Sequence, residues 1–322
     1  MPRGKAAKSL ALIHRSIDIL QEIQPATVRA VCYQLFNQGV IPSMSKKDTN
    51  RVGTQLVYAR EQELIPWRWI VDETRRPERL LVWDDIDECV EYTEASYRRD
   101  YWLAQEYHVE VWSEKGTVRG TLKPVLDRYQ VTFRAMHGFS SATEIHNAAE
   151  QAQEDDRQWL ILYVGDWDPS GMHMSAVDAP GRLEQYGASV AFERLALLPQ
   201  DHAPLQGLSF PASDKRADPR YRWFVANYGH TCWELDAMNP NDLRARVEDA
   251  IVQMIDQNAW AQMQVAERAE TDSLREVLGR WQAARNGHHP HPAHWDYDIM
   301  GNRRLNGEIY FEASMEIDGG SR

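Results

Sequence analysis

Apolar residues recur at helical spacing in three consecutive segments near the start of the chain. The first segment covers residues 7–23, and the second covers residues 28–37 with Thr27 in the N-cap position. A third helix is predicted from about residue 48 to residue 62. Alternating apolar and polar residues over 65–71 then predict a strand. Three helices followed by a strand are typical of a winged helix-turn-helix unit, a fold that docks one helix in a groove of DNA.

Beyond residue 104 the pattern changes to strand-like runs that alternate with helical segments. The runs that predict strands cover 108–112, 129–135, 159–165 and 190–197, and those that predict helices cover 120–128, 142–153 and 172–186. This alternation favours an α/β fold with a mostly parallel, doubly wound sheet. In such sheets ligands bind just past the carboxyl ends of the strands.

Four segments follow from these patterns. They are a winged-helix segment (1–83), a helical connector (84–104), a sheet segment (105–240) and a helical C-terminal extension with a tail (241–322). Within the extension, residues 241–285 predict one long helical stretch, and the His- and Pro-rich tail after it predicts a loop. The tail histidines are His288, His289, His291 and His294, a cluster that could also bind Zn²⁺.

The composition is that of a globular protein of about two domains. Among 322 residues, 12 Trp, 13 Tyr and 7 Phe supply ample core material, which excludes disorder as the main state. The longest apolar run, residues 159–164, is far too short to cross a bilayer, and the basic start of the chain does not form a signal peptide. Three scattered cysteines imply no disulfide framework, so we expect a cytoplasmic protein.

Charge divides the chain into a basic head and an acidic body. The net charge is −12, yet residues 1–80 hold 13 Lys and Arg against 8 Asp and Glu. Residues 81–322 therefore carry 23 basic and 40 acidic residues. An acidic protein as a whole argues against nucleic-acid binding, but this asymmetry allows the head alone to contact DNA. A balance of +5 over 80 residues is also compatible with an ordinary surface.

Three carboxylates follow two of the predicted strands. Glu114 ends the first run, and Asp166 and Asp168 end the third, where Asp-Pro-Ser-Gly turns into a helix. Two Asp and one Glu supply the hard oxygen ligands that suit Mg²⁺. Asp-Pro-Ser-Gly is also ordinary turn chemistry with no catalytic meaning. A Glu at one strand end followed by Asp-x-Asp at another is the arrangement called Toprim, found in topoisomerases, primases and some nucleases.

Three stretches together resemble the A subunit of type IIB topoisomerases and its relative, the meiotic double-strand-break transesterase. The first is TVRAVCY (residues 27–33), similar to the Arg-x-x-x-Tyr element of that family. The second is the Toprim set with DWDPSG (166–171), and the third is CWELDAM (232–238), similar to a Glu-x-x-Ala segment. HGFSS (137–141) also resembles a glycine turn of the family. The resemblance covers about residues 25–240.

The resemblance implies a chemistry for these residues. Tyr33 would attack a DNA phosphodiester to give a 5′-phosphotyrosyl link, and Arg29, four residues earlier on the same helix face, would stabilise the developing charge. Mg²⁺ would lie at Glu114, Asp166 and Asp168. The family further implies a homodimer in which nucleophile and metal come from opposite subunits. Because the chain has no phosphate-binding loop, strand passage would need a separate ATPase subunit. The implied DNA contacts are Lys115, Arg68, Arg75 and Arg76, and the implied location is cytoplasmic and nucleoid-associated.

Other interpretations of the same residues stay open. Tyr33 could be a packed core aromatic, and Cys32 stands where the family often has an aromatic residue, although a thiol among apolar neighbours should be inert. Lys115 could simply belong to a turn, and the tryptophans beside Arg68 could pack on the sheet. At the level of function, the alternatives are a metal-dependent nuclease that uses water as its nucleophile and a DNA-binding scaffold that does not cleave.

Overall fold

The computed structural model describes residues 7–71, 81–136 and 141–288, together with three short strands between residues 295 and 309. The chain divides into two compact units, one made of residues 1–80 and 100–263 and the other of residues 81–99 and 264–322. The first unit holds both the opening helices and the parallel sheet, and the predicted four-segment division stays a prediction. In the described part of the chain, no helix combines the length and apolar character needed to cross a bilayer.

The first unit opens with three helices, close to the predicted positions. They are α1 (Ala7–Ile23), α2 (Val28–Asn37) and α3 (Lys46–Glu61). The Thr27 side chain accepts a hydrogen bond from the Ala30 amide, which caps α2, and Ser45 caps α3 in the same way. Their apolar faces form one core, which includes Leu12, Ile13, Leu20, Val31, Leu35, Val52 and Leu56.

The predicted strand over residues 65–71 is wrong. Residues Trp67–Trp69 form a single turn of 3-10 helix, and only Ile70 makes an isolated bridge, with Ala26. Pro66 lacks an amide hydrogen and starts that turn, so the alternation of apolar residues does not produce a ladder. Trp67 is 59% exposed, although Arg60 stacks over its ring. The described residues therefore contain three helices without a strand wing at this position.

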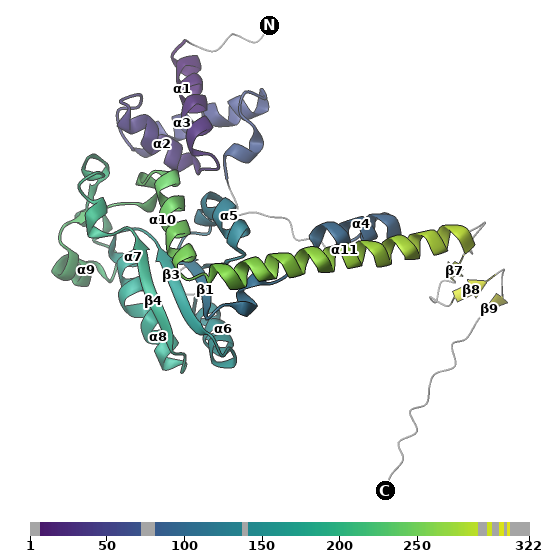
Figure 1. Ribbon diagram of the computed structural model, residues 1–322. Coiled ribbons are helices and arrows are strands. Elements are labelled where there is room, and N and C mark those ends of the chain that lie inside the picture. The colour runs from purple at the N-terminus through teal and green to yellow at the C-terminus, as the bar shows by residue number, and fades with distance from the viewer. Residues whose placement is uncertain are drawn as a thin grey trace. The chain divides into compact units, whose positions relative to one another are not determined.

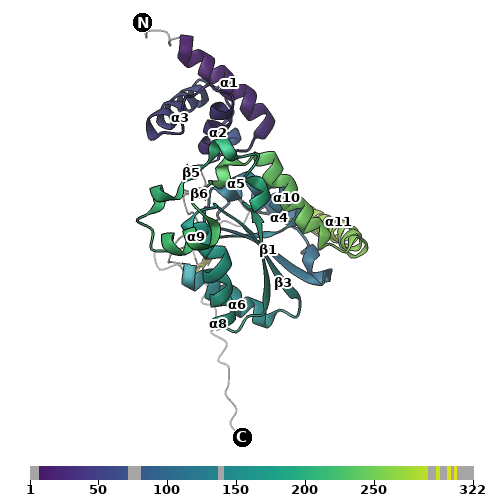
Figure 2. The same cartoon turned by 90° about the vertical axis from the view of Figure 1, so that its left-hand side faces the viewer.

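A four-stranded parallel sheet forms the centre of the first unit, and Figure 2 labels two of its strands, β1 and β3. Its strands are β1 (Tyr107–Ser113), β2 (Thr132–Ala135), β3 (Gln158–Val164) and β4 (Val190–Ala196), in the order β2-β1-β3-β4. Helices α5 (Val118–Tyr129) and α10 (Pro240–Gln253) pack on one face, and α6 (Ser141–Glu154) and α8 (Ala179–Gln185) pack on the other. The predicted α/β fold with a parallel sheet is confirmed at this level.

The alternation along β3 explains why the sheet has two cores. Leu160, Leu162 and Val164 pack with α5 and α10, whereas Trp159, Ile161 and Tyr163 pack with α6 and α8. A strand that is buried on both faces reads as a nearly continuous apolar run, which is what the sequence shows here. The two cores fix β3 in the interior of the sheet. They therefore also fix the start of the turn that follows β3.

Several shorter elements complete the first unit. They are α7 (Pro169–His173), a π-helical turn (Met174–Asp178), α9 (Tyr221–Tyr228), β5 (Phe210–Pro211), β6 (Thr231–Cys232) and 3-10 turns at Tyr101–Ala104, Pro199–Asp201, Gln206–Leu208, Ala212–Lys215 and Leu235–Ala237. The predicted helix over 172–186 therefore begins earlier, at Pro169, and contains a π-helical turn.

Two further predicted bounds need correction. The strand predicted from residue 129 begins only at Thr132, because α5 continues to Tyr129 and Gln130 ends it in the left-handed conformation (φ 53°). The long helix predicted over 241–285 is two helices, because Asp256 accepts hydrogen bonds from the amides of Asn258 and Ala259 and caps a new one.

The second unit contains α4 (Ile86–Ser96) and most of α11 (Gln257–His288), which Figure 1 shows side by side. Polar contacts join them, among them a hydrogen bond from the Tyr97 hydroxyl to Glu270 (2.6 Å). The tail was predicted as a loop, but it contains three antiparallel strands, β7 (Trp295–Tyr297), β8 (Arg303–Leu305) and β9 (Glu308–Ile309). His289, His291 and His294 lie outside the described residues.

Candidate active site at the carboxyl ends of the strands

Tyr33 and Arg29 lie on the same face of α2, as their spacing predicts. The Arg29 guanidinium carbon is 5.7 Å from the centre of the Tyr33 ring. Arg29 also makes two hydrogen bonds to the Glu234 carboxylate, one from Nε and one from Nη2 (2.5 Å). A bidentate pair of this kind fixes the guanidinium in one plane. The partner lies 205 positions further along the chain, so the α2 face is bound directly to the segment around residue 234.

Tyr33 lies in the interior, where the α2 face meets two loops. Its side chain is only 3% exposed and packs with Leu208 and Ala237. Burial raises the pKa of the Tyr33 phenol well above its usual value of about 10, and the Glu234 charge raises it further, although Arg29 opposes both. The phenol is therefore protonated at neutral pH in this arrangement.

A cavity of about 300 Å³ lies beside the Tyr33 ring. Its lining combines two cations, one carboxylate, small hydroxyls and apolar rings: Arg29, Lys215, Glu234, Ser43, Ser209, Phe36 and Phe210. Cys32, by contrast, is fully buried, and burial raises the pKa of its thiol to about 11. A protonated, buried thiol is inert, so the structure gives no support to Cys32 as a nucleophile.

The three predicted carboxylates lie at the carboxyl ends of neighbouring strands. Glu114 directly follows β1 and accepts a hydrogen bond from the Ser170 hydroxyl (3.0 Å). Asp166 follows β3, and one of its oxygens accepts a hydrogen bond from the Leu235 amide (2.8 Å). Asp168 caps α7 by accepting from the Gly171 amide (2.8 Å). The strand ends thus bring all three acids to one region of the molecule.

Each of the two aspartates also has a lysine as partner. Lys115 Nζ lies 2.9 Å from Asp166 and 3.4 Å from Asp236, and Lys215 Nζ lies 3.2 Å from Asp168. Burial opposes the charge of Lys115, but Asp166 and Asp236 outweigh it and hold its pKa above the ordinary value. Both oxygens of each aspartate therefore already have a donor.

Glu114 differs from the aspartates, because it has no lysine among the partners the structure gives it. Burial raises its pKa above the ordinary value, and the neighbouring charges of Asp168 and Asp166 raise it further. Two Asp and one Glu are suitable donors for Mg²⁺. As placed, however, no three His, Cys, Asp or Glu side chains of the described residues form a group that could hold a metal ion. A cation at these acids would have to displace Lys115 and Lys215.

The segment Cys232–Met238 connects the two halves of the site. Arg29 of α2 is bound to Glu234, and the Thr27 hydroxyl donates to Asp236 (2.6 Å). On the other side, the Trp233 backbone pairs with Trp167, the residue between the two site aspartates. The motif in this segment predicts no role for Glu234 or Asp236, and nothing in the sequence predicts one for Lys215, because no local pattern indicates ion pairs between residues so far apart.

Among the arginines predicted to contact DNA, the structure describes Arg68 alone. Arg68 is exposed and lies on the 3-10 turn that replaces the predicted strand. Arg75 and Arg76 lie outside the described residues. Lys115 is the only predicted DNA contact that the described residues place beside the three acids.

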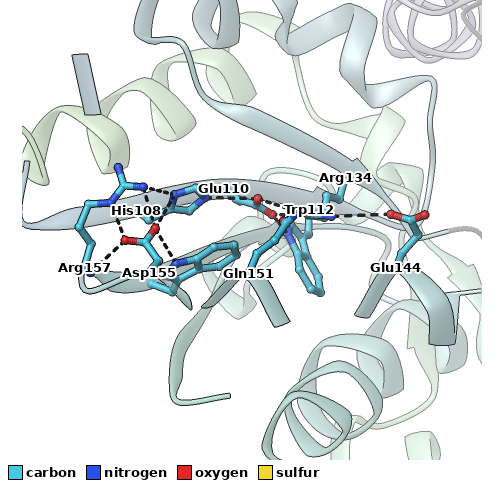
Figure 3. A network of polar contacts seen from close by, with 9 residues as sticks. His108, Glu110, Trp112, Arg134, Glu144, Gln151, Asp155 and Arg157 are labelled. Atoms are coloured by element: carbon cyan, nitrogen blue, oxygen red, sulfur yellow. Dashed lines mark hydrogen bonds and ion pairs between the residues drawn. The ribbon is translucent and has the colours of Figure 1, made fainter. Parts of the chain in front are cut away.

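A second ionic network lies along the strands, and Figure 3 shows it from close by. Glu110 of β1 is 1% exposed and accepts hydrogen bonds from Trp112 Nε1 (2.7 Å) and from Arg134 Nε (2.6 Å) and Nη2 (3.0 Å). Next to it, His108 stacks on Trp159, and Arg157 donates to Asp155. The sequence does not predict this network, because its charged residues come from β1, β2, α6 and the segment before β3, and their pairing depends on how these elements pack.

Models of known protein families were compared with the sequence, and none matches; curated proteins give no match either. The function of the chain is therefore inferred from its residues and their geometry.

Proposed function

We propose that the protein binds duplex DNA and cleaves it by transesterification through Tyr33, in the manner of a type IIB topoisomerase A subunit. The observation that carries the proposal is the meeting of three segments that lie far apart in sequence. Arg29 of α2 is bound to Glu234, and the adjoining Leu235 amide is bound to Asp166. In this proposal the three helices serve as the winged-helix-like DNA-binding part and the sheet as the Toprim part.

The proposed reaction exchanges one phosphodiester for another. The Tyr33 oxygen bonds to phosphorus while the bond from phosphorus to the 3′ oxygen breaks, which leaves a 5′-phosphotyrosyl link. The phenol gives up its proton, and the departing 3′ oxygen takes one up. Arg29, 5.7 Å from the ring, is placed to stabilise the phenolate and the charge that develops on the phosphate. The bond energy is kept in the link, so the strand can be resealed.

Glu114, Asp166 and Asp168 would hold Mg²⁺, which supplies Lewis-acid stabilisation of the scissile phosphate when bound. Lys115 and Lys215 would then be released from the aspartates that they contact here. In this proposal both ammonium groups would turn toward a DNA phosphate instead. Lys215 also lines the Tyr33 cavity, so it connects the acids to the nucleophile within one unit.

The burial of Tyr33 favours a second candidate function. A phenol that is 3% exposed and has a raised pKa cannot reach a duplex phosphate until α2 moves away from Leu208 and Ala237. In a metal-dependent nuclease with water as the nucleophile, Tyr33 would keep this buried position throughout. A scaffold that binds DNA without cleaving it would also leave Tyr33 in place.

The proposal includes partners. A homodimer would make two staggered cuts, one by each subunit, and a separate ATPase subunit would drive strand passage. Lys115, Arg68, Arg75 and Arg76 would contact backbone phosphates, which makes the affinity for DNA fall as salt is raised. A cytoplasmic, nucleoid-associated protein fits this activity.

The test uses supercoiled plasmid and Mg²⁺ with wild type, Tyr33→Phe and, as a matched control, Tyr58→Phe in the neighbouring helix α3. Reactions are stopped with SDS and divided into samples with and without protease. We expect wild type and Tyr58→Phe to yield linear DNA that carries protein, and Tyr33→Phe to yield none. Protein-free breaks in all three samples would establish the nuclease instead. DNA binding without any break in wild type would favour the scaffold.

A further inference from the structure

Arg194 of β4 is a partly buried arginine whose hydrogen bonds go mainly to backbone carbonyls. Its guanidinium donates to the carbonyl oxygens of Gly165 (2.8 Å), Asp166 (2.6 Å), Gly171 (3.0 Å) and Leu197 (2.9 Å). A further bond goes to the Ser175 hydroxyl (2.6 Å). Burying a charge without a carboxylate partner is costly, so such an arrangement needs several well-placed acceptors.

Three of the four carbonyls that Arg194 binds belong to the two ends of the turn that carries the site aspartates. Gly165 and Asp166 begin this turn and Gly171 closes it, with Asp168 between them. The two ends approach closely, because a Cβ on Gly171 would lie 2.4 Å from the Asp166 carbonyl oxygen. Any shift of one end relative to the other would therefore change the direction of both aspartate side chains.

We propose that Arg194 is a positioning residue for Asp166 and Asp168: three of its five hydrogen bonds fix the turn that presents these carboxylates. The functional part of this inference rests on the proposed function, while the geometric part does not. In the contacts described, Arg194 does not bind the carboxylate oxygens of the aspartates. It acts through the backbone of the turn, and its charge lies beneath a group of acids.

Arg244 of α10 offers a matched control. It donates in the same manner to the carbonyls of Ile23 (2.8 Å), Pro25 (3.1 Å) and Thr121 (3.0 Å), none of which belongs to the turn that carries the aspartates. Arg194→Lys and Arg244→Lys each keep the charge and lose the planar set of donors. A general loss of stability would affect both variants alike.

The first measurement is hydrogen–deuterium exchange of the full chain without metal or DNA. The Gly171 and Leu235 amides are bonded to the Asp168 and Asp166 carboxylates, so their exchange reports on the carboxylate positions. In Arg194→Lys we expect peptides over 165–175 and 233–237 to exchange on the order of 10-fold faster, with Arg244→Lys unchanged there. Equal exchange in the two variants would overturn the inference.

The second measurement is the Mg²⁺ concentration that gives half-maximal covalent adduct. For Arg194→Lys we expect this Mg²⁺ concentration to rise on the order of 10-fold. The DNA concentration that gives half-maximal adduct should not change. Arg244→Lys should need the same Mg²⁺ concentration as wild type. An equal change in both variants would make Arg194 a purely structural residue. If wild type forms no adduct, the proposed function fails, and the exchange result alone decides the geometric inference.

Discussion

Two glutamates four residues apart on and after β1 have opposite electrostatic environments. Burial raises the pKa of Glu110, but the hydrogen bonds from His108 and Arg134 outweigh it, so the pKa is lowered. Burial also raises the pKa of Glu114, and there it remains raised, because Ser170 is a weaker partner and Asp168 and Asp166 add their charges. The same residue type on one strand is thus compensated at one position and not at the other.

The difference separates a structural network from a candidate site. Around Glu110, hydrogen bonds from Trp112 and Arg134 compensate the buried negative charge, as Figure 3 shows. At the carboxyl end of the strand, the pKa of Glu114 stays raised although Lys115 and Lys215 contact the aspartates, and a cavity lies beside Lys215. Perturbed groups that lack full compensation cluster at functional sites, and this favours the second region as the one that meets a ligand.

The largest effect is expected from Arg134→Met. This change leaves Glu110 buried without its bidentate partner, at a cost of about 3–5 kcal/mol in the free energy of unfolding. Arg29→Met removes the bidentate partner of Glu234, but the Arg29 side chain is 43% exposed, and the expected cost is about 1 kcal/mol. Urea denaturation of both variants and wild type measures the two values. Equal losses would show that the two regions do not differ in this way.

An intermediate effect is expected from Lys215→Gln. The variant removes the ammonium group that contacts Asp168, so a divalent cation no longer competes with it for that oxygen. We expect Mn²⁺ to bind tighter on the order of 10-fold, which corresponds to about 1.4 kcal/mol. Titration calorimetry measures the affinity, and Lys123→Gln, which breaks an exposed ion pair with Asp127, serves as control. Weaker binding in Lys215→Gln would mean that the lysine supports the metal site rather than blocking it.

The smallest effect concerns Glu114→Gln and pH. A carboxyl with a raised pKa in the folded state holds its proton more tightly than in the unfolded state, so folding is favoured below that pKa and loses stability as pH rises through it. Replacing Glu114 by Gln removes this loss. We therefore expect Glu114→Gln to have a higher Tm than wild type at pH 7, and the difference between the two Tm values to vanish toward pH 4. Thermal denaturation across this pH range measures both values. A lower Tm for the variant at pH 7 would contradict the assignment of Glu114 as an uncompensated charge.

The fold was predictable where one short pattern decides the local structure. The helix α2 follows from its apolar spacing and the Thr27 cap, and β3 follows from its uninterrupted apolar run. The strand expected at residues 65–71 failed because alternation of Trp and Arg also fits a 3-10 turn once Pro66 starts it. The break at Asp256 was missed because a cap inside a long helical pattern is recognised only from its backbone partners.

The candidate site was predictable in its acids and not in its cations. Parallel strands end at the same edge of a sheet, so Glu114 and Asp166 had to lie near one another once their strands were recognised. Lys215, Glu234 and Arg194 come from elements elsewhere in the chain, and their pairing depends on how distant segments pack. No local spacing encodes such contacts.

The central claim is that Tyr33 becomes covalently attached to DNA, and one measurement tests it directly. The SDS-stopped adduct is trimmed with nuclease and digested with trypsin, and the peptides are analysed by mass spectrometry. Cleavage after Arg29 and Lys46 gives a peptide in which Tyr33 is the only tyrosine. We predict that this peptide carries the mass of a residual nucleotide. A nucleotide on a different tyrosine peptide, or cleaved DNA with no protein attached, would contradict the account.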